Sequence, residues 1–189
     1  MTDVTIREAT REDAEAIREV HRASVLELGL EGYDQRQVEA WAAGCDSADY
    51  TEPIDAEDVY AIVATATDAT GTVEHDAGKR IEPGDFVGFG TLRLDSTGEY
   101  EADVDAEVTG VYVHPAVFRQ GVGSQLYATL ERAARERGMD SLGLWASRNA
   151  VAFYERHGYR RVTEHDHEFS SHASTGVEGT VVEMQKDLS

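Results

Sequence analysis

The chain has 189 residues, 41% of them hydrophobic, and its 37 acidic and 17 basic side chains give a formal net charge of −20 at pH 7. This charge disfavours nucleic acid or an anionic membrane as a partner, since both bind basic surfaces. Cys45 is the one cysteine, which excludes an intrachain disulfide and a thiolate-cage metal site. No apolar run approaches the roughly 18 residues of a membrane span, and residues 1–10 lack a signal-peptide pattern. We expect one cytoplasmic domain over residues 1–189.

The charges are unevenly distributed along the chain. Only two of the basic residues are lysines, a composition typical of proteins adapted to high salt, where a strongly acidic surface is screened. Residues 119–161 hold eight arginines and four acidic residues, so this segment is basic within an acidic chain. The segment indicates a site for an anionic ligand, although two arginine-rich helices with solvated faces would give the same composition.

Patterning predicts the secondary structure in chain order. In the first half, alternating or β-rich runs predict strands at 4–6, 59–66 and 86–94. Apolar residues at helical spacing predict helices over 10–28 and 34–43. The second and third strands are expected to form a hairpin across a long polar loop, residues 67–84.

The second half continues with a strand at 107–113 and a helix from 122 that ends at Gly138. A short strand at 142–145 and a helix over 148–157 follow. Two final strands are expected at 159–164 and 179–184. The order β-α-α-β-β-β-α-β-α-β-β predicts an α/β domain with a mixed central sheet covered by helices.

A glycine-containing turn follows the 107–113 strand. Gly121-Val122-Gly123-Ser124 opens the next helix, and its backbone N–H groups together with the helix dipole suit an anion such as a pyrophosphate. The turn lacks the Gly-Lys-Ser/Thr of a Walker loop. Leu126 occupies the third glycine position of the dinucleotide fingerprint, so that motif is excluded as well.

Two motifs resemble the GNAT acetyltransferase superfamily. The stretch 107–130 is similar to its acetyl-CoA motif, whose core reads Gln/Arg-x-x-Gly-x-Gly/Ala after a strand ending in Val-x-Pro. The stretch 149–159 is similar to its second motif, which ends in Phe-Tyr-Glu-x-x-Gly-Phe/Tyr. The resemblance covers nearly the whole chain and implies the GNAT fold, with a splayed sheet, and acetyl transfer from acetyl-CoA to a primary amine. Phe118 stands where the family usually has Gln or Arg, so it stays open whether Arg119, one position later, reaches the pyrophosphate.

The resemblance also implies the residues that bind acetyl-CoA. The backbone of the strand before the glycine turn would pair with the pantetheine arm and polarise the thioester carbonyl; its residues are Val111, Tyr112 and Val113. The pyrophosphate would lie on Arg119, Gln120, Gly121, Val122, Gly123 and Ser124. Asn149 would lie near the pantetheine, or would serve as a helix N-cap instead.

Tyr154 and Glu107 are the candidate catalytic residues. Tyr154 matches the tyrosine that protonates the CoA thiolate in many family members, and the alternative is a plain core aromatic. Glu107 shares strand parity with Val111 and Val113, so it is expected on their face as a base acting directly or through water. The alternatives are that Glu107 is one more surface acid and that His21 is the base.

The acceptor side is expected on the first two helices, as in the family. His21, Tyr33 and Trp41 are the candidate substrate-binding residues, and Tyr33, Gln37 and Trp41 would share one helical face if the second helix begins early enough. This Tyr…Gln…Trp pattern resembles a poorly characterised GNAT subgroup. It could hold a cationic amine or simply seat the helix on the sheet. The partner is expected to be a small-molecule or peptide amine, and a homodimer is left open.

No metal is expected. His165, His167 and His172 lie in a polar connection without a helical frame or a fixed carboxylate partner. Cys45 is expected to be inert, and no Ser-His-Asp or Cys-His arrangement indicates an acyl-enzyme, so direct attack in a ternary complex is favoured. The alternatives are a non-catalytic acyl-CoA sensor and a transferase of another acyl group.

Overall fold

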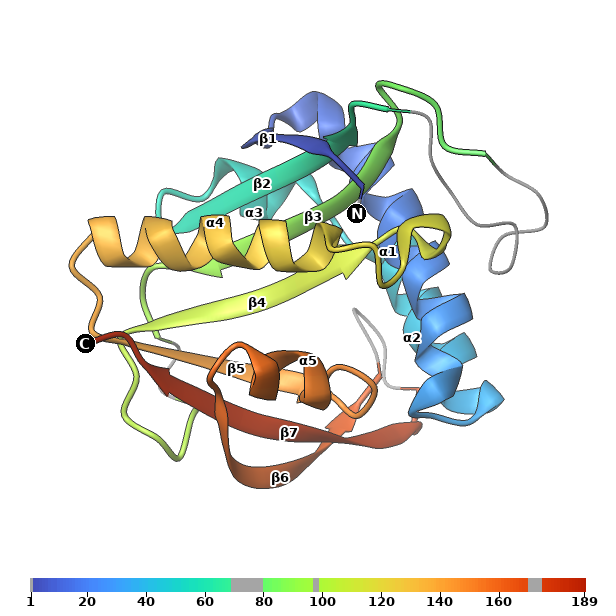
Figure 1. Ribbon diagram of the computed structural model, residues 1–189. Coiled ribbons are helices and arrows are strands. Elements are labelled where there is room, and N and C mark those ends of the chain that lie inside the picture. Colours follow the sequence, from blue (N-terminus) through green and yellow to red (C-terminus); the bar gives the residue numbers. More distant parts are fainter. Residues whose placement is uncertain (1, 69–79, 97–98, 170–174) are drawn as a thin grey trace.

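The computed structural model describes residues 2–68, 80–96, 99–169 and 175–189 (Figure 1). Within these residues a seven-stranded sheet has the order β1-β2-β3-β4-β5-β7-β6. The strands are β1 Val4–Glu8, β2 Val59–Ala66, β3 Phe86–Arg93, β4 Ala106–Val113, β5 Ser141–Ser147, β6 Arg160–Glu168 and β7 Glu178–Asp187. Neighbouring strands are antiparallel except β4 and β5, which run parallel. The predicted mixed α/β sheet is confirmed.

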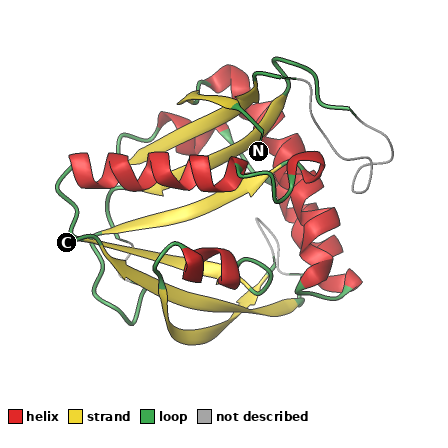
Figure 2. Cartoon of the chain, viewed as in Figure 1, coloured by secondary structure: helices red, strands yellow, loops and turns green. Residues whose placement is uncertain are grey.

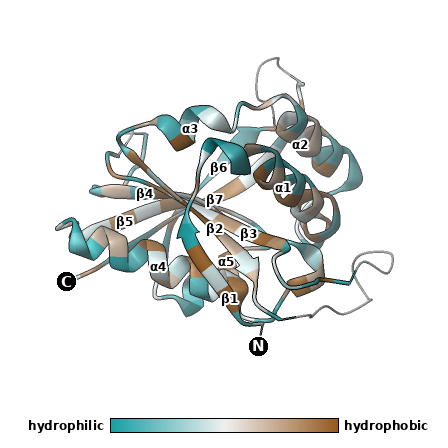
Figure 3. Ribbon diagram, turned by 90° about the horizontal axis from the view of Figure 1, so that it is seen from above, coloured by the Kyte–Doolittle hydropathy of each residue, from teal (hydrophilic) through white to brown (hydrophobic). Residues whose placement is uncertain are grey.

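Helices cover both faces of this sheet (Figure 2). They are α1 Ala14–Leu28, α2 Gln35–Ser47, α3 Thr51–Asp55, α4 Val122–Glu136 and α5 Val151–Arg156. Seen from above, α1, α2 and α3 lie on one face, and α4 and α5 lie on the other (Figure 3). None of the helices within the described ranges has the length and apolar character needed to cross a membrane.

Several elements differ in length from the predicted ranges, and three differences bear on the site. The short helix α3 has no periodic apolar signal and was not expected. Helix α5 starts at Val151 because residues 148–150 form a turn. Strand β6 continues to Glu168, so His165 and His167 lie in a strand. The prediction that they lie in a polar connection is wrong. His172 and residues 69–79 of the predicted loop lie outside the described residues.

Helix α4 packs closely against the centre of the sheet. Its residues at helical spacing, including Leu126 and Leu130, are fully buried. A Cβ at Gly88 would approach Leu126 to 2.9 Å, and one at Gly90 would approach Leu130 to 3.0 Å. Two glycines in β3 therefore allow the helix to lie directly on the sheet.

Strands β4 and β5 diverge immediately after they pair. Among the described residues their register contains only Ala106 with Leu142 and Glu107 with Gly143. Figure 1 shows the two strands close together at one end and apart at the other. The rest of β4 therefore pairs with β3 on one side and presents unpaired backbone groups on the other, which positions the site described below.

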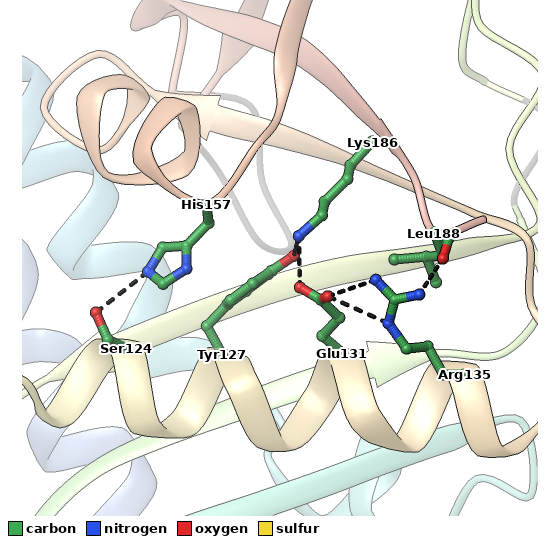
Figure 4. Close-up of polar contacts among 7 residues, drawn as sticks. All are labelled: Ser124, Tyr127, Glu131, Arg135, His157, Lys186 and Leu188. Carbon is green, nitrogen blue, oxygen red and sulfur yellow. Dashed lines mark hydrogen bonds and ion pairs between the residues drawn. The ribbon is translucent and has the colours of Figure 1, made fainter.

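A polar cluster ties α4 to the far side of this opening. Figure 4 shows Lys186 reaching from β7 to Glu131 on α4, with an Nζ–Oε2 distance of 2.6 Å. Arg135 donates to the other oxygen of Glu131 and to the carbonyl of Leu188. The cluster joins α4 to β7 at the end where β4 and β5 are still paired, because Lys186 pairs with Leu142, which in turn pairs with Ala106.

We expect Lys186→Met to lower the free energy of unfolding by about 1–3 kcal/mol, because it leaves a half-buried carboxylate with one cation fewer. Lys186 and Glu131 are only 15% and 18% exposed. The matched control is Arg160→Met, whose pair with Asp187 is exposed on both sides and should contribute below about 0.5 kcal/mol. Urea unfolding of both variants measures the difference, and equal losses would contradict the assigned role of the cluster.

Candidate active site

Two cavities meet where β4 and β5 separate. The larger, of about 600 Å³, runs from the start of α4 past α5. The smaller, of about 350 Å³, lies between β4, β5 and the first two helices. Within the described part of the chain six residues line both cavities: Trp41, Val111, Tyr112, Ser147, Ala150 and Tyr154.

The larger cavity contains the N-terminus of α4. Gly121 is the N-cap with a φ of 88°, a left-handed conformation that favours glycine, and Arg119 before it also has a positive φ of 58°. The first intrahelical bond runs from Gln125 N–H to the Gly121 carbonyl. The N–H groups of the three preceding residues therefore face outward without an acceptor in the helix. These groups and the helix dipole form an anion-binding end that opens on the cavity.

Four of the six residues predicted to hold the pyrophosphate line the larger cavity, and two do not. Arg119, Gly121, Gly123 and Ser124 line the larger cavity. The side chain of Gln120 does not, because it accepts a hydrogen bond from Thr2 and donates one to the Ala116 carbonyl. Val122 is buried in the main core, so only its backbone is available.

Aromatic and basic side chains that were not predicted to bind the ligand also line the larger cavity. Phe118 lies there, with the Arg119 guanidinium 5.1 Å from its ring, and so do Phe153 and Arg156 of α5. Phe153 and Arg156 belong to the same motif as Tyr154. Their positions one before and two after that tyrosine were the available signal.

Asn149 lies beside the larger cavity and has an unsatisfied oxygen. Its Nδ2 donates to the Leu28 carbonyl at 3.1 Å, while Oδ1 is buried and accepts no hydrogen bond from any described residue. The alternative role as N-cap is wrong, because the N-cap of α5 is Ala150. Asn149 therefore presents a buried acceptor beside this cavity.

Tyr154 stands at the junction of the two cavities. Its side chain is 6% exposed and lines both. Burial raises the pKa of its phenol above the ordinary value of 10, so the hydroxyl keeps its proton at neutral pH. The group is a proton donor placed between the two spaces.

Glu107 lies on the opposite face of β4 from the one predicted. Ala106 and Val108 belong to the same core cluster as Val111 and Val113, on the α4 side. Thr109 is an extra residue, because Thr91 pairs with Gly110 while Leu92 pairs with Val108. This bulge reverses the alternation of side chains, so the expected shared face of Glu107, Val111 and Val113 is wrong.

The bulge directs Glu107 into the smaller cavity. Its side chain is 16% exposed, and its carboxylate interacts with the buried hydroxyl of Tyr100, whose pKa it raises. The nearest cation is Arg93, with its Nη1 3.9 Å from Oε2. Glu107 is therefore an available proton acceptor in the cavity that adjoins Tyr154.

Comparison with known proteins identifies the family. The model of the acetyltransferase (GNAT) family matches residues 36–159, about two thirds of the chain. The chain belongs to the GNAT acetyltransferase family. A search among curated proteins finds no match.

Solved structures share the fold of this GNAT enzyme. A GCN5-related N-acetyltransferase from Rhodopseudomonas palustris is 24% identical, with a TM-score of 0.73 over 99% of this chain and 98% of that one. The PaiA N-acetyltransferase from Thermoplasma acidophilum, in complex with coenzyme A, is 17% identical, with a TM-score of 0.65 over 98% and 99%. The yncA structure from Salmonella typhimurium, with its cofactor acetyl-CoA, is 19% identical, with a TM-score of 0.55 over 100% and 95%.

His21 lies in the smaller cavity of the acetyltransferase and is neutral. Its ring packs against that of Tyr112, with the two centroids 4.0 Å apart, and its Nδ1 lies 2.9 Å from the Tyr50 hydroxyl oxygen. Its Nε2 is buried and bonds to none of the residues the structure describes. Burial lowers the pKa of His21 to about 4, so the ring is uncharged near pH 7.

The three residues expected on one face of α2 do not form one helical face, although the rings of Tyr33 and Trp41 are in contact, with centroids 5.8 Å apart. Asp34 caps α2, so Tyr33 precedes the helix, and Gln37 closes the capping box. Tyr33 lines neither cavity; its hydroxyl donates to the Thr180 carbonyl and accepts from the Arg148 N–H. Trp41 lines both cavities and is the one of the three placed to contact a ligand.

Cys45 and the histidines offer no further chemistry. Burial raises the pKa of the Cys45 thiol to about 11, so it is not a thiolate at neutral pH. His165 bonds the buried Glu183 at 2.8 Å. Across the described ranges no three His, Cys, Asp or Glu side chains gather as a metal site would require.

Proposed function

We propose that this GNAT enzyme transfers an acetyl group from acetyl-CoA to a primary amine by direct attack in a ternary complex. The observation that carries the proposal is the junction of the two cavities at Val111 and Tyr154. A donor in the larger cavity and an acceptor in the smaller one would meet there. Proximity of this kind removes much of the entropic barrier to a bimolecular reaction.

The larger cavity fits acetyl-CoA. The start of α4 offers N–H groups to the pyrophosphate, including that of Gly123, and the open edge of β4 offers backbone groups to the pantetheine arm. The unsatisfied Oδ1 of Asn149 suits a pantetheine amide N–H. Two structures of the same fold, cited above, contain CoA or acetyl-CoA.

The residues at the junction supply the proton transfers. The amine nitrogen bonds to the thioester carbonyl carbon, and a β4 backbone N–H at Val111 stabilises the oxyanion that forms. Glu107 accepts the proton that the amine loses, directly or through a water. As the carbon–sulfur bond breaks, Tyr154 donates its proton to the departing thiolate. The products are the acetylated amine and CoA.

A covalent acyl-enzyme has no support from the site. Cys45 lines the smaller cavity, but burial raises the pKa of its thiol to about 11, which disfavours the thiolate that would attack the thioester. Direct transfer needs only groups that the two cavities already present. We propose acetyl as the group carried, with a longer acyl group and a non-catalytic acyl-CoA sensor as the alternatives.

The experiment that tests this function measures two quantities on the purified full chain. Calorimetry gives the Kd of acetyl-CoA, and a thiol-release assay gives turnover with a panel of amines. The proposal predicts binding together with thiol release that depends on an amine. Tight binding without turnover on any amine would support the sensor instead, and turnover with a longer acyl-CoA alone would change the donor.

We expect Glu107→Gln to lower kcat by about 10- to 100-fold near neutral pH and to change the pH profile, because the amide cannot accept the proton. The measurement is kcat between pH 6 and pH 9, with His21→Gln as the comparison. His21 does not titrate in this range, since its pKa is about 4. An unchanged profile in Glu107→Gln with a large loss in His21→Gln would assign the base to His21.

A further inference from the structure

Aromatic rings form the walls of the smaller cavity. Trp41 of α2 stacks on Phe169 with centroids 5.3 Å apart and meets the edge of Tyr112 at 6.5 Å. Trp145 of β5 meets the edge of His167 on β6 at 6.2 Å. All five line the cavity, although they come from segments far apart in the sequence.

One charge faces these rings. Among the described residues that line the smaller cavity, Glu107 is the only carboxylate, and none is Lys or Arg. Burial lowers the pKa of both His21 and His167, which leaves these rings neutral near pH 7. Arg93 approaches Glu107 from outside the cavity, at 3.9 Å and 38% exposed. The described lining therefore combines aromatic and small polar side chains with a single carboxylate.

Two polar side chains in the lining of the smaller cavity, Glu107 and Trp145, bear on ligand binding. The carboxylate of Glu107 is 16% exposed and interacts with the Tyr100 hydroxyl, while the buried Nε1 of Trp145 makes no hydrogen bond to the part of the chain that the structure describes. The nearest cation, Arg93, is 3.9 Å from the Glu107 carboxylate, so an ammonium in the cavity would still stabilise its charge. The volume of about 350 Å³ is at the lower end of small-molecule sites.

We propose that the acceptor is a small primary amine with a compact aromatic or apolar body and no anionic group. This proposal rests on the acetyl transfer proposed above. The body of the amine would pack on Trp41 and Trp145, and its ammonium would meet Glu107 and the faces of the rings before it loses a proton.

The same features select against other classes of amine. An amino acid or an amino-sugar phosphate would bring its own carboxylate or phosphate close to Glu107. No Lys or Arg in the described lining of the cavity would neutralise that second negative charge. A polyamine would place additional ammonium groups among rings with only one carboxylate.

The test uses matched ligands on the CoA-loaded full chain. Calorimetry compares phenethylamine with phenylalanine, which adds only a carboxylate, and with phenylalanine amide, in which that carboxylate is masked. We expect phenethylamine to bind at least about tenfold more tightly than phenylalanine, and the amide to recover most of the loss. Spermidine should bind more weakly than phenethylamine. Thiol release with acetyl-CoA should give kcat/KM values in the same order.

A substitution in the smaller cavity tests whether the selectivity for the amine arises there. Trp145→Leu should lower kcat/KM for phenethylamine by about tenfold and leave the Kd of acetyl-CoA unchanged, because Trp145 lines the smaller cavity and not the larger. The matched control is Tyr60→Leu, which removes a β2 ring that lines neither cavity and packs against Arg137. The control should keep full activity.

The outcomes separate this proposal from the proposed function. Equal or tighter binding of phenylalanine or spermidine, with turnover to match, would overturn the acceptor class while leaving acetyl transfer intact. Acetyl-CoA binding with no turnover of any aromatic or apolar amine would also overturn it. Failure to bind acetyl-CoA at all would instead overturn the proposed function.

Discussion

Tyr154→Phe is expected to lower kcat by about 100-fold or more and to leave the Kd of acetyl-CoA within about twofold. The ring is retained, so the packing at the junction of the cavities should persist, while the proton for the thiolate is lost. Thiol release with saturating amine measures kcat, and calorimetry measures the Kd.

Tyr159→Phe is the matched control for this prediction. Its ring lies 5.6 Å from that of Tyr154, and its buried hydroxyl interacts with the hydroxyl of Tyr127. Tyr159 lines neither cavity, so removing its oxygen should not change kcat. Equal rates in the two variants would contradict the role of Tyr154 as the acid.

Gly123→Val is expected to raise the Kd of acetyl-CoA by about 100-fold, which corresponds to roughly 2.8 kcal/mol of binding free energy. A Cβ at Gly123 would meet protein atoms only at 3.6 Å or beyond, at ordinary contact distances. The free protein therefore tolerates a side chain there, and valine is a slightly better helix former than glycine. The side chain would occupy the space in which the pyrophosphate approaches the helix N-terminus.

The control for this variant is Ala128→Val, on an exposed position of the same helix. It adds the same side chain away from both cavities and should leave the Kd unchanged. Melting temperatures of both variants monitor folding. Wild-type affinity in Gly123→Val would show that the start of α4 does not hold the pyrophosphate.

Local patterns predicted most of the fold and the larger cavity. The helical spacing of Leu126 and Leu130 marks the buried face of α4, and the glycines before it mark the anion-binding turn. The Phe-Tyr-Glu motif placed Tyr154, which the structure brings to the junction. These features depend on residues close together in the sequence, so they can be read without the tertiary structure.

The smaller cavity could not be predicted in this way. The bulge at Thr109 turns Glu107 to the other face, and the neighbouring Gly110 within the strand was the one available signal for it. Trp145 and His167 come together through β7, which pairs with both of their strands. Such long-range pairing carries no local signal. The sequence around His165 and His167 alternates as a strand does, which places both histidines on one face of the sheet. It does not indicate which residues of other strands they meet.

The central claim is that the acetyl group passes directly between the two cavities. Its most direct test follows the label after incubation of the protein with acetyl-radiolabelled acetyl-CoA, followed by acid quenching. We predict no label on the protein without an amine, and rapid appearance of labelled amide when an amine is present. Label bound covalently to the protein, and released to an amine added afterwards, would contradict direct transfer.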